Sequence, residues 1–265
     1  MIRRINQIGC SQRVRLEWLE KAANLVLAGN AKAAVNNALQ ELLKDQVSIG
    51  GAAKRGNREK IVTILAKVWV APPAGLESLR DGGLELLKRV PRRCQVAVHW
   101  GMVMAVYPFW GAVGVQVGRL LRLQGAAAAA HVQRRVREQY GERETVSRAV
   151  RRVLRSYVDW GVLRNSGKKG IYVADPPLTV EDSRLIAWLI EASLHSLSNG
   201  SAMLNELLVH PSLFPFHFKP IHLRRALAAS ENIEMTEQNL DNYLVMLRRL
   251  QLPGSRRKQP WGDKV

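Results

Sequence analysis

The sequence predicts a mainly α-helical protein with one small β-hairpin near its centre. Apolar residues recur at intervals of three and four over much of the 265-residue chain, which is the spacing of one helix face. Two short β-prone segments, around Leu163 and at residues 171–173, are joined by a glycine-bounded loop. Proline-containing breaks near residues 91 and 176 then divide the chain into a helical N-terminal domain (1–92), a central domain (93–177) and a helical C-terminal domain (178–265).

The N-terminal domain is predicted to hold four helices, at residues 14–27, 31–43, 58–69 and 76–87. Between the second and third lies a basic loop in which Gly51 and Gly56 have the separation of the glycines in a phosphate-binding loop. That motif needs Lys and then Ser or Thr where this sequence has Asn57 and Arg58, and no strand precedes it. We therefore expect a solvated loop or a phosphate-backbone contact instead of a nucleotide site.

Residues 94–118 contain no charged side chain other than a protonatable His99, so the run is long enough to cross a bilayer. Pro108, Gln116 and four glycines interrupt it, however, which is unfavourable in a spanning helix. We expect two buried helices, at residues 96–107 and 110–123, packed through their clustered aromatic residues. The sequence does not favour a membrane partner.

The helix predicted at residues 143–159 carries the clearest pattern in the chain. One face is apolar, through Val146, Val150, Val153, Tyr157 and Trp160. The opposite face is basic, through Arg148, Arg151, Arg152 and Arg155. A helix at residues 127–140 precedes it across Gly141, and a hairpin whose tip is Asn165-Ser166-Gly167-Lys168-Lys169-Gly170 follows it.

This stretch resembles a winged-helix domain, a helix-turn-helix unit followed by a β-hairpin wing. The resemblance covers about 65 residues, from near Phe109 to Asp175, and is carried by Gly141, residues 145–148, Leu154, residues 160–163 and Tyr172. It implies a recognition helix at residues 143–159 and a wing at the hairpin. Because winged helices also dock proteins, the resemblance does not by itself decide the function.

The C-terminal domain is predicted to be helical at residues 185–197, 202–209, 221–229 and 236–250. A proline-rich, aromatic connection at residues 210–220 separates the second of these helices from the third. The tail from Pro253 carries Arg256, Arg257 and Lys258.

A formal net charge of +18 and a pI near 10.6 favour a polyanionic partner. From His131 to Arg155 eight arginines face three glutamates, and such repulsion is relieved by a polyanion. We therefore expect duplex DNA as the partner, with RNA left open, and the following contact residues: Arg134, Arg135, Arg143, Thr145, Ser147, Arg148, Arg151, Arg152, Arg155, Lys168 and Lys169. The alternative is a protein-docking adaptor within a larger nucleic-acid-handling complex.

Catalysis and cofactors are not expected. His217 and His222 are five residues apart across Pro220, which does not place two imidazoles on one helix face, and no cysteine lies near them. The carboxylates lack the spacing that metal-dependent nucleases use. Cys10 and Cys94 are far apart in sequence, so two reduced thiols in a cytoplasmic protein are expected.

Overall fold

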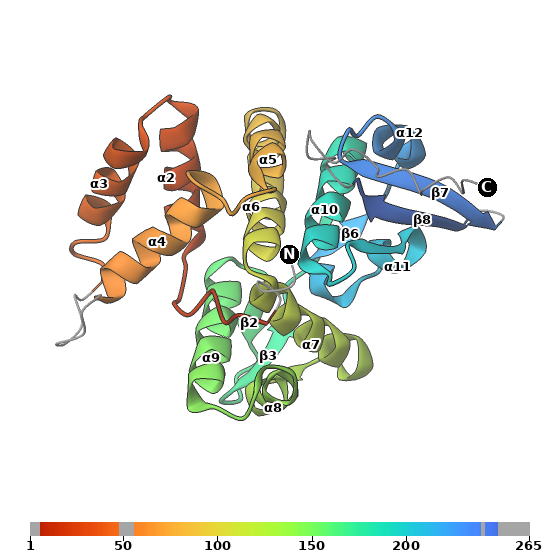
Figure 1. The fold of residues 1–265 in the computed structure, drawn as a ribbon. Coiled ribbons are helices and arrows are strands. Elements are labelled where there is room, and N and C mark those ends of the chain that lie inside the picture. Colours follow the sequence, from red (N-terminus) through yellow and green to blue (C-terminus); the bar gives the residue numbers. More distant parts are fainter. Residues whose placement is uncertain (1–5, 48–55, 240–241, 249–265) are drawn as a thin grey trace, which may run out of the picture.

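The computed structural model describes residues 6–47, 56–239 and 242–248. It confirms a mainly helical protein, and it contains a few small sheets where the sequence predicted a single hairpin. Three helices, α2 (Leu16–Leu27), α3 (Lys32–Leu42) and α4 (Asn57–Trp69), pack together at one side of the molecule (Figure 1). Leu19, Leu39 and Leu65, one from each helix, are fully buried. Most of the glycine-containing loop before α4, including Gly51, lies outside the described residues, and Gly56 is the residue that precedes the helix.

The middle of the molecule is built on α5 (Glu77–Arg89) and α6 (Arg92–Val106). From Ala97 to Val106 every residue of α6 is buried, because α6 packs against α2, α4, α5 and the later helix α10 (Ser183–Ser196). Its contact with α10 is close: a Cβ at Gly101 would lie 2.5 Å from a ring carbon of Trp188. Gly101 therefore allows the two helices to approach closely.

The uncharged run forms two helices, as predicted: α6 and α7 (Pro108–Gln124) meet at a bend of 116°. Within the described ranges no single helix has the length and apolar composition of a membrane span, and only this bent pair meets those criteria jointly. The residues around the bend lie in the core. Trp100 packs against the rings of Trp110, Tyr157 and Trp160 at centroid distances of 5.4, 4.7 and 6.1 Å.

The central part of the chain continues from α7 through β1 (Ala127–Ala128), α8 (Ala129–Tyr140), α9 (Glu144–Asp159), β2 (Leu163–Asn165) and β3 (Ile171–Ala174). The three strands form an antiparallel sheet in the order β1-β3-β2. The short strand β1 begins where the sequence predicted the start of a helix. It pairs Ala127 with Tyr172 and Ala128 with Ile171.

The C-terminal part contains more β-structure than the sequence predicted. Besides α10 it comprises β4 (Leu178–Val180), β5 (Ser201–Met203), α11 (Leu204–Leu208), the 3-10 helix η1 (Pro211–Leu213), β6 (Phe216–Phe218), α12 (Leu223–Ala228), β7 (Ile233–Asn239) and β8 (Asn242–Leu247). β4 and β6 pair in parallel, and β8 lies between β5 and β7 in an antiparallel sheet.

The helix predicted at residues 236–250 is therefore wrong, because β7 and β8 form a hairpin there. Tyr243, Leu244 and Leu247 have helical spacing, but their pairing partners on β7 and β5 hold them in a strand. Val245, which the helical pattern did not include, is the residue of β8 that is fully buried. Packing against a third strand has outweighed the local pattern. The basic tail from Pro253 lies outside the described residues.

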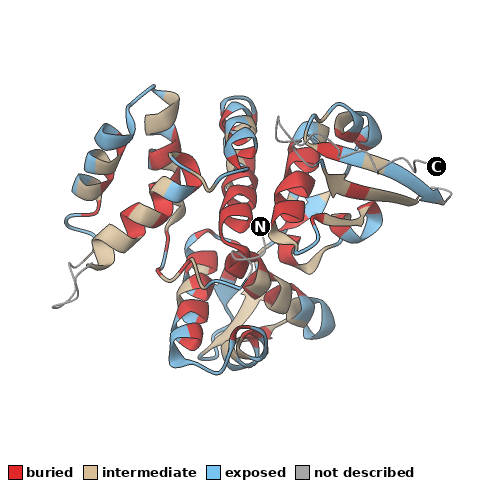
Figure 2. Ribbon diagram, viewed as in Figure 1, coloured by how far each residue is buried: buried red, intermediate tan, exposed pale blue. Residues whose placement is uncertain are grey.

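One hydrophobic cluster runs through all these parts, from Cys10 to Val245 (Figure 2). The aromatic residues expected to pack in the centre are buried: Trp100, Tyr107, Phe109 and Trp110 are each exposed by 6% or less. Cys10 and Cys94 are buried and free of any disulfide. The central helices thus hold the exposed face of α9 on a fixed base.

Candidate nucleic-acid interface

The candidate interface is formed by α8, α9 and the β2–β3 loop. A tight turn at Gly141 joins the two helices, and its φ of 96° is a conformation that favours glycine. Tyr140, the last residue of α8, packs edge-on against Phe109 of α7 at 5.0 Å. This contact and the turn fix where α9 begins.

The apolar face of α9 is buried, as predicted. Val146, Val150, Val153 and Tyr157 are fully buried, and Trp160 just after the helix is 6% exposed. The Tyr157 hydroxyl donates a hydrogen bond of 2.6 Å to the Trp110 carbonyl oxygen. With this face in the core, α9 must turn its arginine-bearing face outward.

The basic face of α9, which we define as Arg148, Arg151 and Arg155, is exposed to solvent. Arg151 forms an ion pair of 2.7 Å with Glu144 on the same helix. Arg148 and Arg155 form no ion pair with any residue in the described part of the chain. Two guanidinium groups are therefore available to an external anion.

Thr145 and Arg143 lie at the start of the same helix and are also exposed. The Arg143 side chain donates a 3.2 Å hydrogen bond to the carbonyl oxygen of Tyr140. Arg143 directly precedes α9 and Thr145 lies in its first turn, so both lie at the N-terminal end of the basic face.

Ser147 is a wrong prediction, because its side chain lies in the interior. It is only 3% exposed and therefore cannot reach a groove of DNA. Ser147 and Leu154 are seven residues apart, so they lie on the same side of the helix, and Leu154 is fully buried.

The side chain of Arg152 is only partly available to bind DNA. Its Nη1 donates a hydrogen bond to the carbonyl oxygen of Ser11, and the residue is half-buried. Burial and then the nearby charges of Arg148, Arg151 and Arg155 lower the pKa of Arg152. The shift is a sign of the unfavourable charge density on this side of α9.

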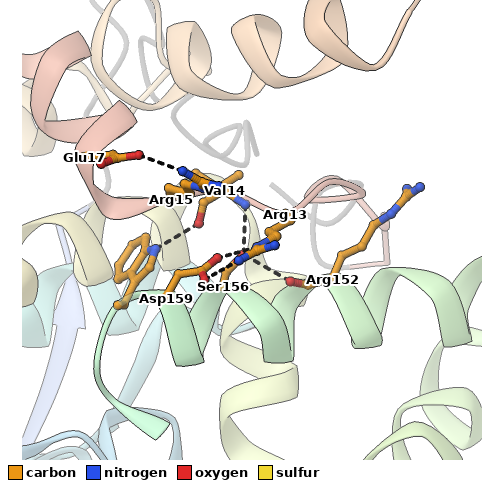
Figure 3. A network of polar contacts seen from close by, with 8 residues as sticks. Arg13, Val14, Arg15, Glu17, Arg152, Ser156 and Asp159 are labelled. Atoms are coloured by element: carbon orange, nitrogen blue, oxygen red, sulfur yellow. Dashed lines mark hydrogen bonds and ion pairs between the residues drawn. The ribbon is translucent and has the colours of Figure 1, made fainter. Parts of the chain in front are cut away.

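The N-terminal arm, which we define as residues 6–15, crosses the C-terminal half of α9 (Figure 3). Arg13 makes a two-pronged ion pair with Asp159, and this hydrogen bonding raises the pKa of Arg13. The backbone N–H of Val14 donates to Ser156 Oγ at 2.9 Å, and the Trp160 indole donates to the Val14 carbonyl at 3.0 Å.

The arm has two consequences for the interface. It covers one side of the end of α9 beyond Arg151. Through Arg13 it also neutralises the negative charge of Asp159, the last residue of α9. The partners are up to 146 residues apart in sequence, so no local pattern could have indicated these contacts.

Lys168 and Lys169 are exposed in the loop between β2 and β3. Gly167 and Gly170 on either side have φ values of 86° and 75°, which allow the chain to reverse within a few residues. Arg164 of β2 forms an ion pair of 3.5 Å with Asp175, so the two lysines are the cations at the tip of this hairpin.

Arg134 and Arg135 of α8 are exposed and Arg137 is half-buried, and the charge of each is partly compensated by a glutamate. Arg134 and Arg135 both lie near the carboxylate of Glu138, at 4.0 and 3.7 Å. Arg137 pairs with Glu142 at 3.1 Å. These groups therefore add less to the positive potential than Arg148 and Arg155 do.

Two buried ionisable groups lie away from this surface. Burial lowers the pKa of His99 to about 3, and its Nδ1 accepts a 3.1 Å hydrogen bond from Trp69. Burial raises the pKa of Glu191 to about 7, opposed by a hydrogen bond from Asn232. Within the described ranges no three His, Cys, Asp or Glu residues are grouped as metal ligands.

The basic face of α9, Arg143, Thr145 and the two loop lysines are thus exposed, while Ser147 is buried and Arg152 is half-buried. Comparisons with protein-family models, with curated proteins and with solved structures gave no match.

Proposed function

We propose that this protein binds duplex DNA, with residues 108–174 acting as a winged-helix module. The order α7-β1-α8-α9-β2-β3 and the strand order β1-β3-β2 support this proposal, since a helix-turn-helix unit is followed by a hairpin that closes a small sheet. In this proposal α9 is the recognition helix and the β2–β3 loop is the wing.

The observation that carries the proposal is the state of Arg148 and Arg155. Both are exposed on a helix whose opposite face is fully buried, and neither has a carboxylate partner among the described residues. Keeping like charges close together on one helix costs a few tenths of a kcal/mol for each i,i+4 pair. Phosphate groups would offset that cost and would release condensed counterions.

The dimensions of α9 decide which half would enter a groove. Its 16 residues span about 24 Å at about 1.5 Å per residue, while the major groove of B-form DNA is about 12 Å wide. The N-terminal arm contacts α9 at Arg152, Ser156 and Asp159, so the half that it leaves open is the N-terminal one. Arg148 and Arg151 then face the phosphates at the groove edges, and Arg155 faces the backbone farther out.

Six exposed cations make up the proposed contact set: Arg143, Arg148, Arg151, Arg155, Lys168 and Lys169. With about six phosphate neutralisations, the logarithm of the binding constant should fall against the logarithm of salt concentration with a slope of about −5. Thr145 supplies a hydroxyl to a phosphate. Arg134 and Arg135 strengthen the general attraction from α8.

The test measures, by fluorescence anisotropy, how tightly the double variant Arg148→Glu with Arg151→Glu binds a labelled duplex. Both side chains are exposed, so the melting temperature should be unchanged while binding is lost. A matched control is Arg92→Glu with Arg93→Glu at the exposed start of α6, which changes the net charge equally. Equal loss in both variants, or no appreciable duplex binding by the unmodified protein, would refute the proposal and favour the docking adaptor.

A further inference from the structure

A second surface of this protein is apolar. Leu123, Val209 and Ile221 are the large hydrophobic residues that are strongly exposed in the described part of the chain, at 82%, 62% and 62%. Val209 lines a cavity of about 400 Å³, and Ile221 directly follows the lining residue Pro220, whereas Leu123 lines a different hollow beside Leu120 and Arg135. We call this cavity the apolar groove. It lies between the C-terminal end of α7, the end of α11, η1 and β6.

The walls of the apolar groove are aromatic and aliphatic, and comprise Leu121, Leu213, Phe214, Phe216 and Phe218. The rings of Phe214 and Phe216 pack edge-on against Trp100 of the core at 5.7 and 5.9 Å. At the floor, a Cβ on Gly118 would lie 2.1 Å from the carbonyl oxygen of Pro211, so α7 packs directly against the first residue of η1. The groove is therefore preformed, and little ordering is needed to fill it.

The rim of the apolar groove is basic. Arg122 lines it and donates a 2.7 Å hydrogen bond to the carbonyl oxygen of Val209. Exposed Lys219 lies between two lining residues, and exposed Arg119 follows the lining residue Gly118. Burial, then Arg119 and Arg122, lower the pKa of His210 in the groove, while Glu206 alone among its neighbours opposes this shift. Arg119, Arg122 and Lys219 thus lie near the groove, where the carboxylates are Glu206 and Asp175, and Asp175 is already paired with Arg164.

We propose that the apolar groove binds an acidic amphipathic helix of a partner protein. The apolar side chains of such a helix enter between the phenylalanines and Val209, and its carboxylates meet Arg119, Arg122 and Lys219. A second copy of this chain fits less well, because two identical basic rims and two net charges of +18 would repel each other. DNA fits less well too, because its charged phosphate groups do not pack favourably against the aromatic side chains that line the groove. This inference does not depend on the proposed DNA binding.

The probe that tests it is a fluorescent synthetic peptide of about four helical turns, with leucines at i, i+3, i+4 and i+7 and glutamates elsewhere. A matched peptide carries lysines in place of the glutamates. The acidic peptide should bind the full chain with a dissociation constant on the order of micromolar, and the basic peptide roughly tenfold more weakly or not at all. Binding of neither peptide, or equal binding of both, would overturn the proposal.

Two variants locate the binding. Val209→Glu with Ile221→Glu alters two exposed positions. It should lower the affinity for the acidic peptide by roughly tenfold and leave the affinity for duplex DNA unchanged. Arg148→Glu with Arg151→Glu should leave peptide binding unchanged. If instead the second variant abolishes peptide binding, the peptide is held by the basic face of α9 and the proposal fails. Concentration-dependent dimerisation that the first variant removes would also contradict it, because it would make a second copy the occupant.

Discussion

Replacing Arg148 and Arg155 with alanine removes the two guanidinium groups of α9 that are exposed and have no carboxylate partner among the described residues. Neither side chain supports the core, so the free energy of unfolding should change by less than about 0.5 kcal/mol. The proposed contact set falls from six cations to four. The double variant therefore separates an effect on DNA binding from an effect on folding.

The expected magnitude follows from counterion release. At about 0.9 per phosphate contact, the slope of log binding constant against log salt changes from about −5.4 to about −3.6. Between about 50 and 200 mM salt, the unmodified protein should lose affinity by about 2,000-fold and the variant by only about 150-fold. The variant should also bind more weakly than the unmodified protein at every salt concentration.

Fluorescence anisotropy with one labelled duplex over a salt series measures both slopes. The control is Arg92→Ala with Arg93→Ala, which removes the same charge from the exposed start of α6 and should leave the slope at about −5.4. If the Arg148/Arg155 variant keeps the slope of the unmodified protein, or if the control variant reduces the slope by the same amount, α9 does not contact the duplex through these two arginines.

Four further results are expected. Lys168→Ala with Lys169→Ala should reduce the salt slope by about 2 units in the same titration; an unchanged slope would exclude the loop from the interface. Ser147→Ala should leave duplex affinity unchanged because the side chain is buried, and a tenfold loss would contradict its placement. Arg13→Ala should lower the free energy of unfolding in urea by about 1 kcal/mol, through loss of the part-exposed ion pair with the end of α9; no change would show that the pair contributes nothing. Because burial raises the pKa of Glu191 to about 7 from 4.5, the folded protein holds a proton that the unfolded chain releases between these values. Stability should therefore fall as pH rises through that window, and Glu191→Gln should reduce the fall by about 3 kcal/mol in urea unfolding at several pH values; a parallel pH dependence would count against the burial of this carboxyl group.

Much of the helical framework could be predicted from the sequence, because its signals are local. Pro108 separates α6 from α7, and Gly141 separates α8 from α9. The β7–β8 hairpin could not be predicted in this way. Tyr243, Leu244 and Leu247 have the spacing of a helix face, and the strand is favoured by pairing with β7 and with β5, the latter some 40 residues earlier in the sequence.

The candidate interface, like the fold, could be predicted only where its signals are local. Periodicity alone indicated that Arg148, Arg151 and Arg155 would face outward, since they lie opposite a continuous apolar stripe. Ser147 was assigned wrongly because a small polar residue at the flank of a stripe can lie on either side of the boundary. The contact of Arg13 with Asp159 depends on how the arm crosses α9, which the sequence of neither segment indicates.

The central claim, that the open half of α9 lies against duplex DNA, can be tested by DNA cleavage from a tethered iron chelate. Thr145→Cys places a reactive thiol on the exposed first turn of α9, and the two natural cysteines are buried, so the label attaches at the new position. We expect the bound duplex to be cut over a short stretch from position 145 and not from a label at Arg92→Cys. Equal cutting from both positions, or none from position 145, would contradict the account.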